Sequence, residues 1–183
     1  ASGTGPTAGS FLRVWQAGRP RPLVSNLNYS GGQTVPNLVT VAVGQDGKLS
    51  VFNGAGSTHV IFDVLGYYSS STGPFGARFV PLDPVRVFDT RDGTGGVAPQ
   101  PIGPAGSLPF DLTGQGLLPE TGVSGVVMNV TVTEPTGNGY LTVHPDGVAR
   151  PLASNLNFVP GQTVANLVTV RLSPAGVARF FNA

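Results

Sequence analysis

The sequence predicts an all-β protein, folded as a two-sheet β-sandwich built from a repeated half. The first observation is that residues 25–41 recur at residues 154–170, with an offset of 129 and no gap. The second is that β-branched and aromatic residues occur in short runs separated by glycine turns. The third is that no stretch shows the apolar periodicity of a helix.

The repeat extends beyond this stretch. Residues 4–54 and 133–183 match at about half of their positions, and residues 55–129 have no second copy. The order is therefore A-B-A, where A is the repeated half and B the unique one. One A and one B suit a single sandwich, so one A is left over. We expect it to fold as a satellite on the first unit, to pair with another molecule, or to belong to a longer array.

Each copy contains four runs with strand character. In the first copy they are Phe11–Trp15, Leu23–Tyr29, Val35–Val43 and Leu49–Asn53. In the third run, the two-residue period places Asn37 on the same side as the valines. A polar amide on an apolar side needs partners, so we expect Asn37 and its counterpart Asn166 to be buried and hydrogen-bonded to backbone groups.

The unique half begins with the run of strongest strand character, Thr58–Tyr68, followed by a Ser/Gly-rich linker at residues 69–76. Further strands and loops are expected in the rest of this half. The strands are residues 79–82, 85–91, 108–112 and 123–133, and the loops are residues 92–96 and 99–104.

Composition excludes several classes of protein. Charged residues make up 10% of the 183 residues and the formal net charge is +1, so no charged field attracts nucleic acid. The absence of cysteine excludes a disulfide framework, thiol catalysis and thiolate metal sites. No apolar run reaches the roughly 18 residues that span a bilayer. We therefore expect no cofactor and no nucleic-acid or membrane partner.

Several motifs together resemble a repeat found in secreted actinobacterial proteins. They are Phe-x-Pro-Leu-x-Pro-x-Arg-x-x-Asp-Thr-Arg at Phe79–Arg91, Asn-Val-Thr-Val-Thr at Asn129–Thr133, Gly-Tyr-Leu-Thr-Val at Gly139–Val143, the repeated Ser-Asn-Leu-Asn and Gly-Gln-Thr-Val, and Phe-Asp-Val-Leu-Gly-Tyr-Tyr at Phe62–Tyr68. Such repeats stand in tandem, beside cell-wall or polymer hydrolases or in large surface proteins. The resemblance implies an extracellular, modular protein, with residues 1–72 as part of one unit and residues 73–183 as a second unit lacking its last strand.

The best chemical cluster is Arg86-x-x-Asp89-Thr90-Arg91-Asp92. Asp63 lies in an otherwise apolar run, where a lone carboxylate is costly. We therefore expect structural ion pairs among Asp63, Arg86, Asp89 and Arg91, with Asp63 bonded to one of the arginines. The alternative is a calcium site made by Asp89, Asp92 and Thr94 around a glycine turn, although the alternating acidic series of known calcium loops is missing.

No catalytic constellation is expected. Glu120, Glu134, Asp111 and Asp146 each lie in a turn context, and nothing pairs two of them for glycoside hydrolysis. The two histidines, His59 and His144, lack the Gly-x-Ser-x-Gly elbow of a serine hydrolase.

Several ring-bearing side chains support an alternative to a structural role, which is carbohydrate binding. Trp15, Tyr67, Tyr68 and His144 are candidates for a platform on which sugars stack. We thus expect a non-enzymatic structural or adhesive module of the cell surface that associates with itself or with neighbouring repeats. The alternative is a carbohydrate-binding module that attaches a secreted hydrolase to cell wall or polysaccharide.

Overall fold

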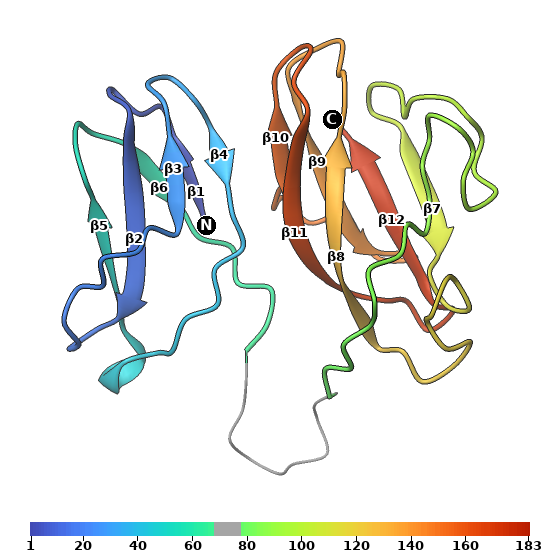
Figure 1. Cartoon of the computed structure of the whole chain (residues 1–183), viewed down its shortest axis with the longest axis horizontal. Coiled ribbons are helices and arrows are strands. Elements are labelled where there is room, and N and C mark those ends of the chain that lie inside the picture. The colour runs from blue at the N-terminus through green and yellow to red at the C-terminus, as the bar shows by residue number, and fades with distance from the viewer. Residues whose placement is uncertain (68–77) are drawn as a thin grey trace. The chain divides into compact units, whose positions relative to one another are not determined.

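The computed structural model describes residues 1–67 and 78–183 (Figure 1). Within these residues the protein is all-β, as predicted, with strands in four sheets and one 3-10 turn at Gln45–Gly47. No helix in this part of the chain has the length and hydrophobicity needed to cross a membrane. The predicted linker at residues 69–76 and the predicted unit boundary at residue 72 lie outside the described residues.

Six strands come from the N-terminal part of the chain. They are β1 (Ser2–Thr4), β2 (Ser10–Gln16), β3 (Leu27–Tyr29), β4 (Val35–Pro36), β5 (Leu49–Asn53) and β6 (His59–Ile61). They form two three-stranded sheets, in the orders β4-β1-β6 and β3-β2-β5. All the pairings within these two sheets are antiparallel.

Six further strands follow. They are β7 (Ser107–Asp111), β8 (Gly125–Val132), β9 (Gly139–Pro145), β10 (Leu156–Phe158), β11 (Val164–Arg171) and β12 (Val177–Asn182). One sheet has the order β10-β9-β12-β7, and the other contains β11 and β8. Strand β12 lies between β9 and β7 and pairs antiparallel with both.

The chain divides into two compact units. The first contains Ala1–Asp63, Asn129–Asn138 and Asn155–Leu167. The second contains Val64–Met128, Gly139–Ser154 and Val168–Ala183.

The duplicated sequence forms duplicated pairings. Trp15 of β2 lies opposite Ser50 of β5, and His144 of β9 lies opposite Arg179 of β12, so both members shift by the same 129 residues. The turns repeat as well, because Gly32 N–H donates to Pro6 O and Gly161 N–H donates to Pro135 O, both at 2.8 Å. Identity at about half of the positions is thus enough for the two copies to keep one hydrogen-bond register.

In several strands the two-residue period decides which side chains are buried, although in β9 the four successive residues 141–144 are all buried. In the first unit, Leu12, Leu27 and Tyr29 form a core cluster against which Val35 and Val60 pack. In the second unit, Phe110, Leu141 and Phe180 belong to the buried set. Burial of a side chain the size of phenylalanine contributes about 1.5–3 kcal/mol, so each of these positions stabilises the fold.

The strand predicted at Val35–Val43 is wrong in extent. Strand β4 covers only Val35–Pro36, whereas the identical sequence Asn-Leu-Val-Thr-Val lies inside β11 in the second copy. Strand β11 pairs with the eight residues of β8, but β4 pairs with the three residues of β1. A strand forms only where a partner satisfies its backbone groups, so context overrides propensity here.

The strand predicted at Thr58–Tyr68 is also too long. Strand β6 covers only His59–Ile61, which pair with Ser2–Thr4 of β1. No strand forms at residues 79–82 or 85–91, where Pro81 and Pro84 remove backbone donors. An isolated bridge between Asp89 and Thr94 is the β pairing found there.

Candidate functional site

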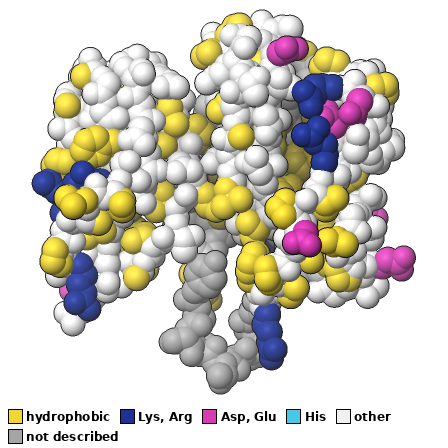
Figure 2. All heavy atoms as spheres, viewed as in Figure 1, with side chains coloured by type: hydrophobic (Ala, Val, Ile, Leu, Met, Phe, Trp, Pro, Cys, Tyr) yellow, Lys and Arg dark blue, Asp and Glu magenta, His cyan; other side chains and the backbone are white. Residues whose placement is uncertain are grey.

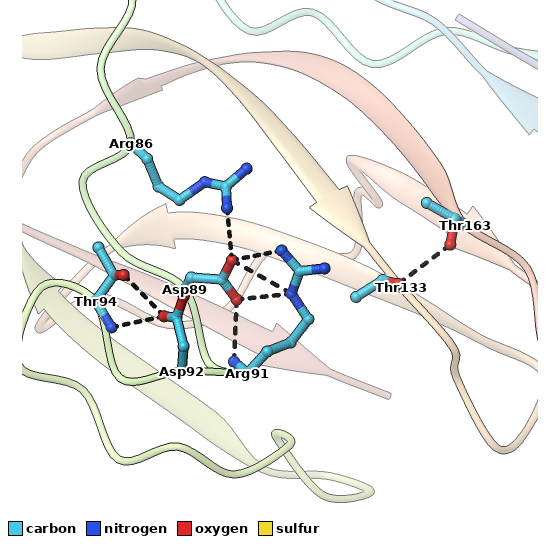
Figure 3. A network of polar contacts seen from close by, with 7 residues as sticks. All are labelled: Arg86, Asp89, Arg91, Asp92, Thr94, Thr133 and Thr163. Atoms are coloured by element: carbon cyan, nitrogen blue, oxygen red, sulfur yellow. Dashed lines mark hydrogen bonds and ion pairs between the residues drawn. The ribbon is translucent and has the colours of Figure 1, made fainter.

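The charged cluster at the start of the glycine-rich loop is centred on Asp89 (Figure 3). Arg86 Nη1 lies 2.9 Å from Asp89 Oδ2, and Arg91 Nη2 lies 2.7 Å from the same oxygen. Arg91 Nε also donates to Asp89 Oδ1 at 3.0 Å, so Arg91 binds the carboxylate through two nitrogens. The Asp89 side chain is 10% exposed and the arginine side chains are 62% and 60% exposed.

These contacts keep Asp89 ionised. The side-chain hydrogen bonds from Arg91, followed by the bond from its backbone N–H, hold the pKa of Asp89 well below its usual range. The positive charge of Arg86 acts in the same direction. At neutral pH the carboxylate is therefore an anion bonded to two cations, which suits a structural link and not a proton donor or acceptor.

Asp92 closes the turn that follows. Its Oδ1 accepts hydrogen bonds from Thr94 N–H at 2.9 Å and from Thr94 Oγ1 at 2.8 Å, and these bonds lower the pKa of Asp92. Gly95 has a positive φ of 77°, and a Cβ atom there would lie 2.2 Å from Val87 O. The turn thus requires glycine at residue 95 for both backbone conformation and space.

The loop positions an aromatic ring against two strands. Phe88 directly precedes Asp89, and its ring centroid lies 4.8 Å from that of Phe110 on β7. The Phe88 ring also meets Phe180 on β12 edge-on, at 4.9 Å. Aromatic pairs at such distances add about 0.5–1.5 kcal/mol beyond the area that they bury. The Asp89 cluster therefore acts by fixing the backbone next to a core ring.

The calcium alternative does not fit the donor atoms. Calcium prefers six to eight oxygen ligands with free lone pairs. Both carboxylate oxygens of Asp89 accept hydrogen bonds from arginine, and the Oδ1 atom of Asp92 accepts two from Thr94. Two guanidinium groups beside Asp89 would also repel a cation.

The pairing predicted for Asp63 stays a prediction. Asp63 lies beyond the end of β6 and is exposed, so the costly burial that motivated the pairing is not present. Arg86 and Arg91 both bind Asp89, which lies three and two residues away along the chain. An ion pair between residues close in sequence costs less chain entropy to form than a pair between distant residues.

The candidate stacking rings differ in accessibility. Trp15 is half-buried and its Nε1 donates to Arg19 O at 2.9 Å. His144 occupies the equivalent position on β9 and is 4% exposed, with Nδ1 placed 2.9 Å from Pro145 O. A buried ring offers no face to a sugar, so His144 is not a stacking residue. Tyr67 is 88% exposed, and Tyr68 lies outside the described residues.

The carboxylates considered for catalysis serve local structure. Asp146 Oδ1 lies 2.6 Å from Arg179 Nη2, and Asp111 Oδ1 accepts hydrogen bonds from Thr113 N–H and Oγ1. Glu120 borders a shallow hollow of about 330 Å³ formed by Thr113 and the loop residues 121–123 and 174–176. Glu134 has a positive φ of 50° in a turn. His59 is exposed on β6.

Sequence reasoning missed one feature that both copies share. The guanidinium of Arg21 lies 3.9 Å from the ring centroid of Phe52, and that of Arg150 lies 4.0 Å from the ring centroid of Phe181. Both residue types are kept at the 129-residue offset although many of their neighbours differ. That retention is the signal that predicts a cation–π pair on the solvent side of the sheet.

Hydrophobic side chains are distributed over the visible surface, and charged side chains occupy only small areas (Figure 2). Among the exposed apolar side chains are Leu23, Val64 and Leu152, at 89%, 87% and 99%. Comparison of the chain with known protein families, with curated proteins and with solved structures finds no match.

Proposed function

We propose that this chain is a non-enzymatic, extracellular structural or adhesive module. Each complete unit is a two-sheet sandwich made from a repeated half and a unique half, and units join through exposed β surface. One observation carries the proposal. Apolar residues of the repeated half that are buried in and beside β11 of the second copy are half-buried or exposed in the first.

The exposure of matched residues shows the difference. Val168, Val170 and Leu172 are 1%, 6% and 4% exposed in and beside β11. Their counterparts Val39 and Val41 are half-buried, and Val43 is 56% exposed. Exposed apolar residues at positions built for a core favour association, because burial yields about 25 cal/mol per Å².

The composition favours the same conclusion. Natural edge strands are kept apart by lysines and other charges. This chain has one lysine, Lys48, and its charged residues make up 10% of the total. Strand edges with so few charges are open to pairing with another repeat. The resemblance to tandem repeats of secreted proteins supports a cell-surface location for such contacts.

Analytical ultracentrifugation of the full chain over a concentration series tests the proposal. We expect the weight-average sedimentation coefficient to rise with concentration. Val43→Lys should reduce the rise, because it places a charge on the exposed apolar segment. Val148→Lys is the matched control, since Val148 is also 56% exposed but lies in the second unit.

The carbohydrate-binding alternative gives a different result. A chain that stays monomeric at every concentration, binds soluble cell-wall glycan and loses that binding with Trp15→Ala would overturn the proposal. Trp15→Phe serves as the control there, because it keeps a flat ring for stacking.

A further inference from the structure

The side of β2 and β5 that faces away from the buried Leu12 carries arginines stacked on aromatic rings. The guanidinium of Arg13 lies 4.7 Å from the ring centroid of Phe11, and that of Arg21 lies 3.9 Å from the ring centroid of Phe52. The two ring centroids are 6.2 Å apart, and Arg13 lies opposite Phe52 in the register of the two strands. The arginine face is defined here as Phe11, Arg13, Trp15, Arg19, Arg21 and Phe52.

The positive charges of this face lack acidic partners. Arg19 and Arg21 are exposed, and Trp15 Nε1 donates to Arg19 O at 2.9 Å, so Arg19 lies beside the indole. Arg13 is half-buried, and its Nε atom is buried with no hydrogen-bond partner among the described residues. Within residues 1–67 and 78–183 no salt bridge joins any of these three arginines to a carboxylate. Because neighbouring cations repel each other, an anion bound beside them would be stabilised.

Two of the three arginines are particular to the first copy. At the offset of 129 residues, Arg13 corresponds to Thr142 and Arg19 corresponds to Val148. Thr142 is 0% exposed and its Oγ1 donates to Ala153 O at 3.0 Å, so its polar group is satisfied within the fold. The second copy keeps the same strand register without either arginine. The repeated half therefore does not need a cation at these positions, which leaves both arginines free for a ligand.

The acidic residue on this side of the second copy is also missing from the first. Arg179 of β12 binds Asp146, with 2.6 Å between Nη2 and Oδ1. Ser50 and Ala17 occupy the equivalent positions in the first copy. The second copy thus has two arginines and one aspartate where the first has three arginines and no carboxylate.

A strand beside this face does not close it. In the second copy β7 flanks β12, and Ser107 Oγ of β7 accepts a hydrogen bond from Arg179 at 2.9 Å. Arg150 is stacked on Phe181 there and is still exposed. The exposure of the stacked arginine is thus a property of the repeated half itself.

We propose that the arginine face binds an acidic polysaccharide, in which the sugar units carry carboxylate or phosphate groups. Arginine binds both kinds of anion through paired N–H donors in one plane, and a guanidinium stacked on a ring keeps that plane in place. The half-buried rings of Trp15 and Phe11 supply flat apolar surfaces beside the cations for the sugar rings. The inference rests on the proposed function and names the class of ligand to which the adhesive module attaches.

The combination of few cations and several rings favours an acidic polysaccharide over other ligands. A neutral sugar would stack on the rings but would leave the three arginines without anions. A nucleic acid has a denser row of charges, and proteins that hold one make roughly 6–10 phosphate contacts. The chain has a net charge of +1, so it supplies no wider positive field for such a partner.

Titration of the full chain with an oligogalacturonate tests the proposal directly. Trp15 is the only tryptophan and belongs to the arginine face, so its emission reports on binding there. The fully methyl-esterified form of the same oligomer is the neutral control, because it keeps the sugar rings and removes the charges. A phosphomannan oligosaccharide of equal charge shows whether phosphate serves as well as carboxylate. We expect saturable binding of at least one acidic oligomer, and binding of the ester that is weaker by about tenfold or more.

Substitutions taken from the second copy locate the site. Arg13→Thr should lower the affinity for the acidic oligomer about tenfold, and the addition of Arg19→Val should lower it further. Ala17→Asp copies Asp146 and should weaken binding without removing an arginine. Arg171→Thr is the matched control, since Arg171 is exposed on β11 and its loss changes the net charge equally. Circular dichroism should show the same strand content in all these variants, because the second copy folds with the substituted residues.

The outcomes separate this inference from the proposed function. The polysaccharide site is overturned by equal affinity for the methyl ester, by binding that survives Arg13→Thr with Arg19→Val, or by no binding at millimolar concentration. Equal affinity for single-stranded DNA of the same charge also overturns it. If the chain still associates in the ultracentrifuge in those cases, the proposed function stands. If the acidic oligomer binds as expected but the chain is monomeric, the arginine face remains a polysaccharide site, and the joining of units is the part that fails.

Discussion

Asp89 is the residue on which the glycine-rich loop depends. Replacing it with asparagine removes the charge that Arg86 and Arg91 bind while keeping nearly the same shape. We expect Asp89→Asn to lower the midpoint of thermal unfolding at pH 7. Circular dichroism at increasing temperature measures this, and Asp83→Asn, at an exposed acidic residue in the same segment, is the control.

The effect of Asp89→Asn should depend on pH. The pKa of Asp89 is lowered in the folded state, mainly by the Arg91 side chain, from its ordinary value of 3.8. A lowered pKa stabilises the fold above the unfolded-state value, and this contribution disappears as the pH falls through the folded-state value. The difference in melting temperature between wild type and Asp89→Asn should therefore be full above about pH 5 and shrink below pH 4. A constant difference down to pH 2 contradicts the ion-pair explanation.

Gly95 and Gly96 offer a matched pair of substitutions. Both have positive φ angles, 77° and 75°. A Cβ atom at Gly95 meets Val87 O at 2.2 Å, but at Gly96 it meets nothing within 4 Å. Gly96→Ala should cost roughly 1–2 kcal/mol from backbone strain alone. Gly95→Ala should cost clearly more, and urea denaturation compares the two.

At the scale of single residues, the sequence predicted hydrogen-bond partners more accurately than it predicted the burial of side chains. The amides of Asn37 and Asn166 do donate to backbone carbonyls, those of Asn26 and Asn155, but both side chains are half-buried where burial was expected. Spacing shows which face a residue shares, and the density of packing on that face depends on a second sheet that spacing does not describe. The same limit explains His144, which is buried although its counterpart Trp15, also on a strand with a neighbour on each side, is half-buried.

Among the elements, β4 and β11 show how far local sequence determines a strand. The sequence at residues 37–41 equals that at residues 166–170, yet only the second copy is a strand there. Turns and alternation predicted β2, β5, β7 and β8 to within two residues. They could not predict that β4 stops at Pro36, because a strand ends where its partner ends.

Hydrogen exchange provides a direct test of this contrast. The two identical pentapeptides have nearly the same intrinsic exchange rates, so differences in protection report on structure. We expect amides of residues 167–170 to exchange at least about tenfold more slowly than those of residues 38–41, which corresponds to about 1.4 kcal/mol. Two-dimensional NMR resolves both sets, with amides of β2 and β9 as protected references. Equal protection in the two copies would show that residues 38–41 have a partner in solution.

For the whole molecule, composition and duplication predicted the all-β class, and the pairings of the two copies share one register. The sequence did not predict how segments combine into units, since the first unit contains Asn129–Asn138 and Asn155–Leu167 from the other end of the chain. Such combinations depend on long-range packing. A duplicated sequence with near-identical motifs supplies two acceptable partners for one segment, so the motifs alone do not select between them.

The salt dependence of association distinguishes an apolar contact between repeats from an electrostatic one. The chain has a net charge of +1, and Val43 of the exposed apolar segment is 56% exposed. Screening at 0.5 M sodium chloride weakens contacts between exposed charges, because the Debye length falls to about 4 Å. It leaves apolar burial intact, and sulfate strengthens that burial. We therefore expect the association constant from sedimentation to change less than about twofold between 0.05 and 0.5 M sodium chloride and to rise in ammonium sulfate. A tenfold loss in sodium chloride would instead assign the contact to the exposed arginines, Arg86 and Arg91 among them, and Arg91→Gln would then reduce association while Val43→Lys would not.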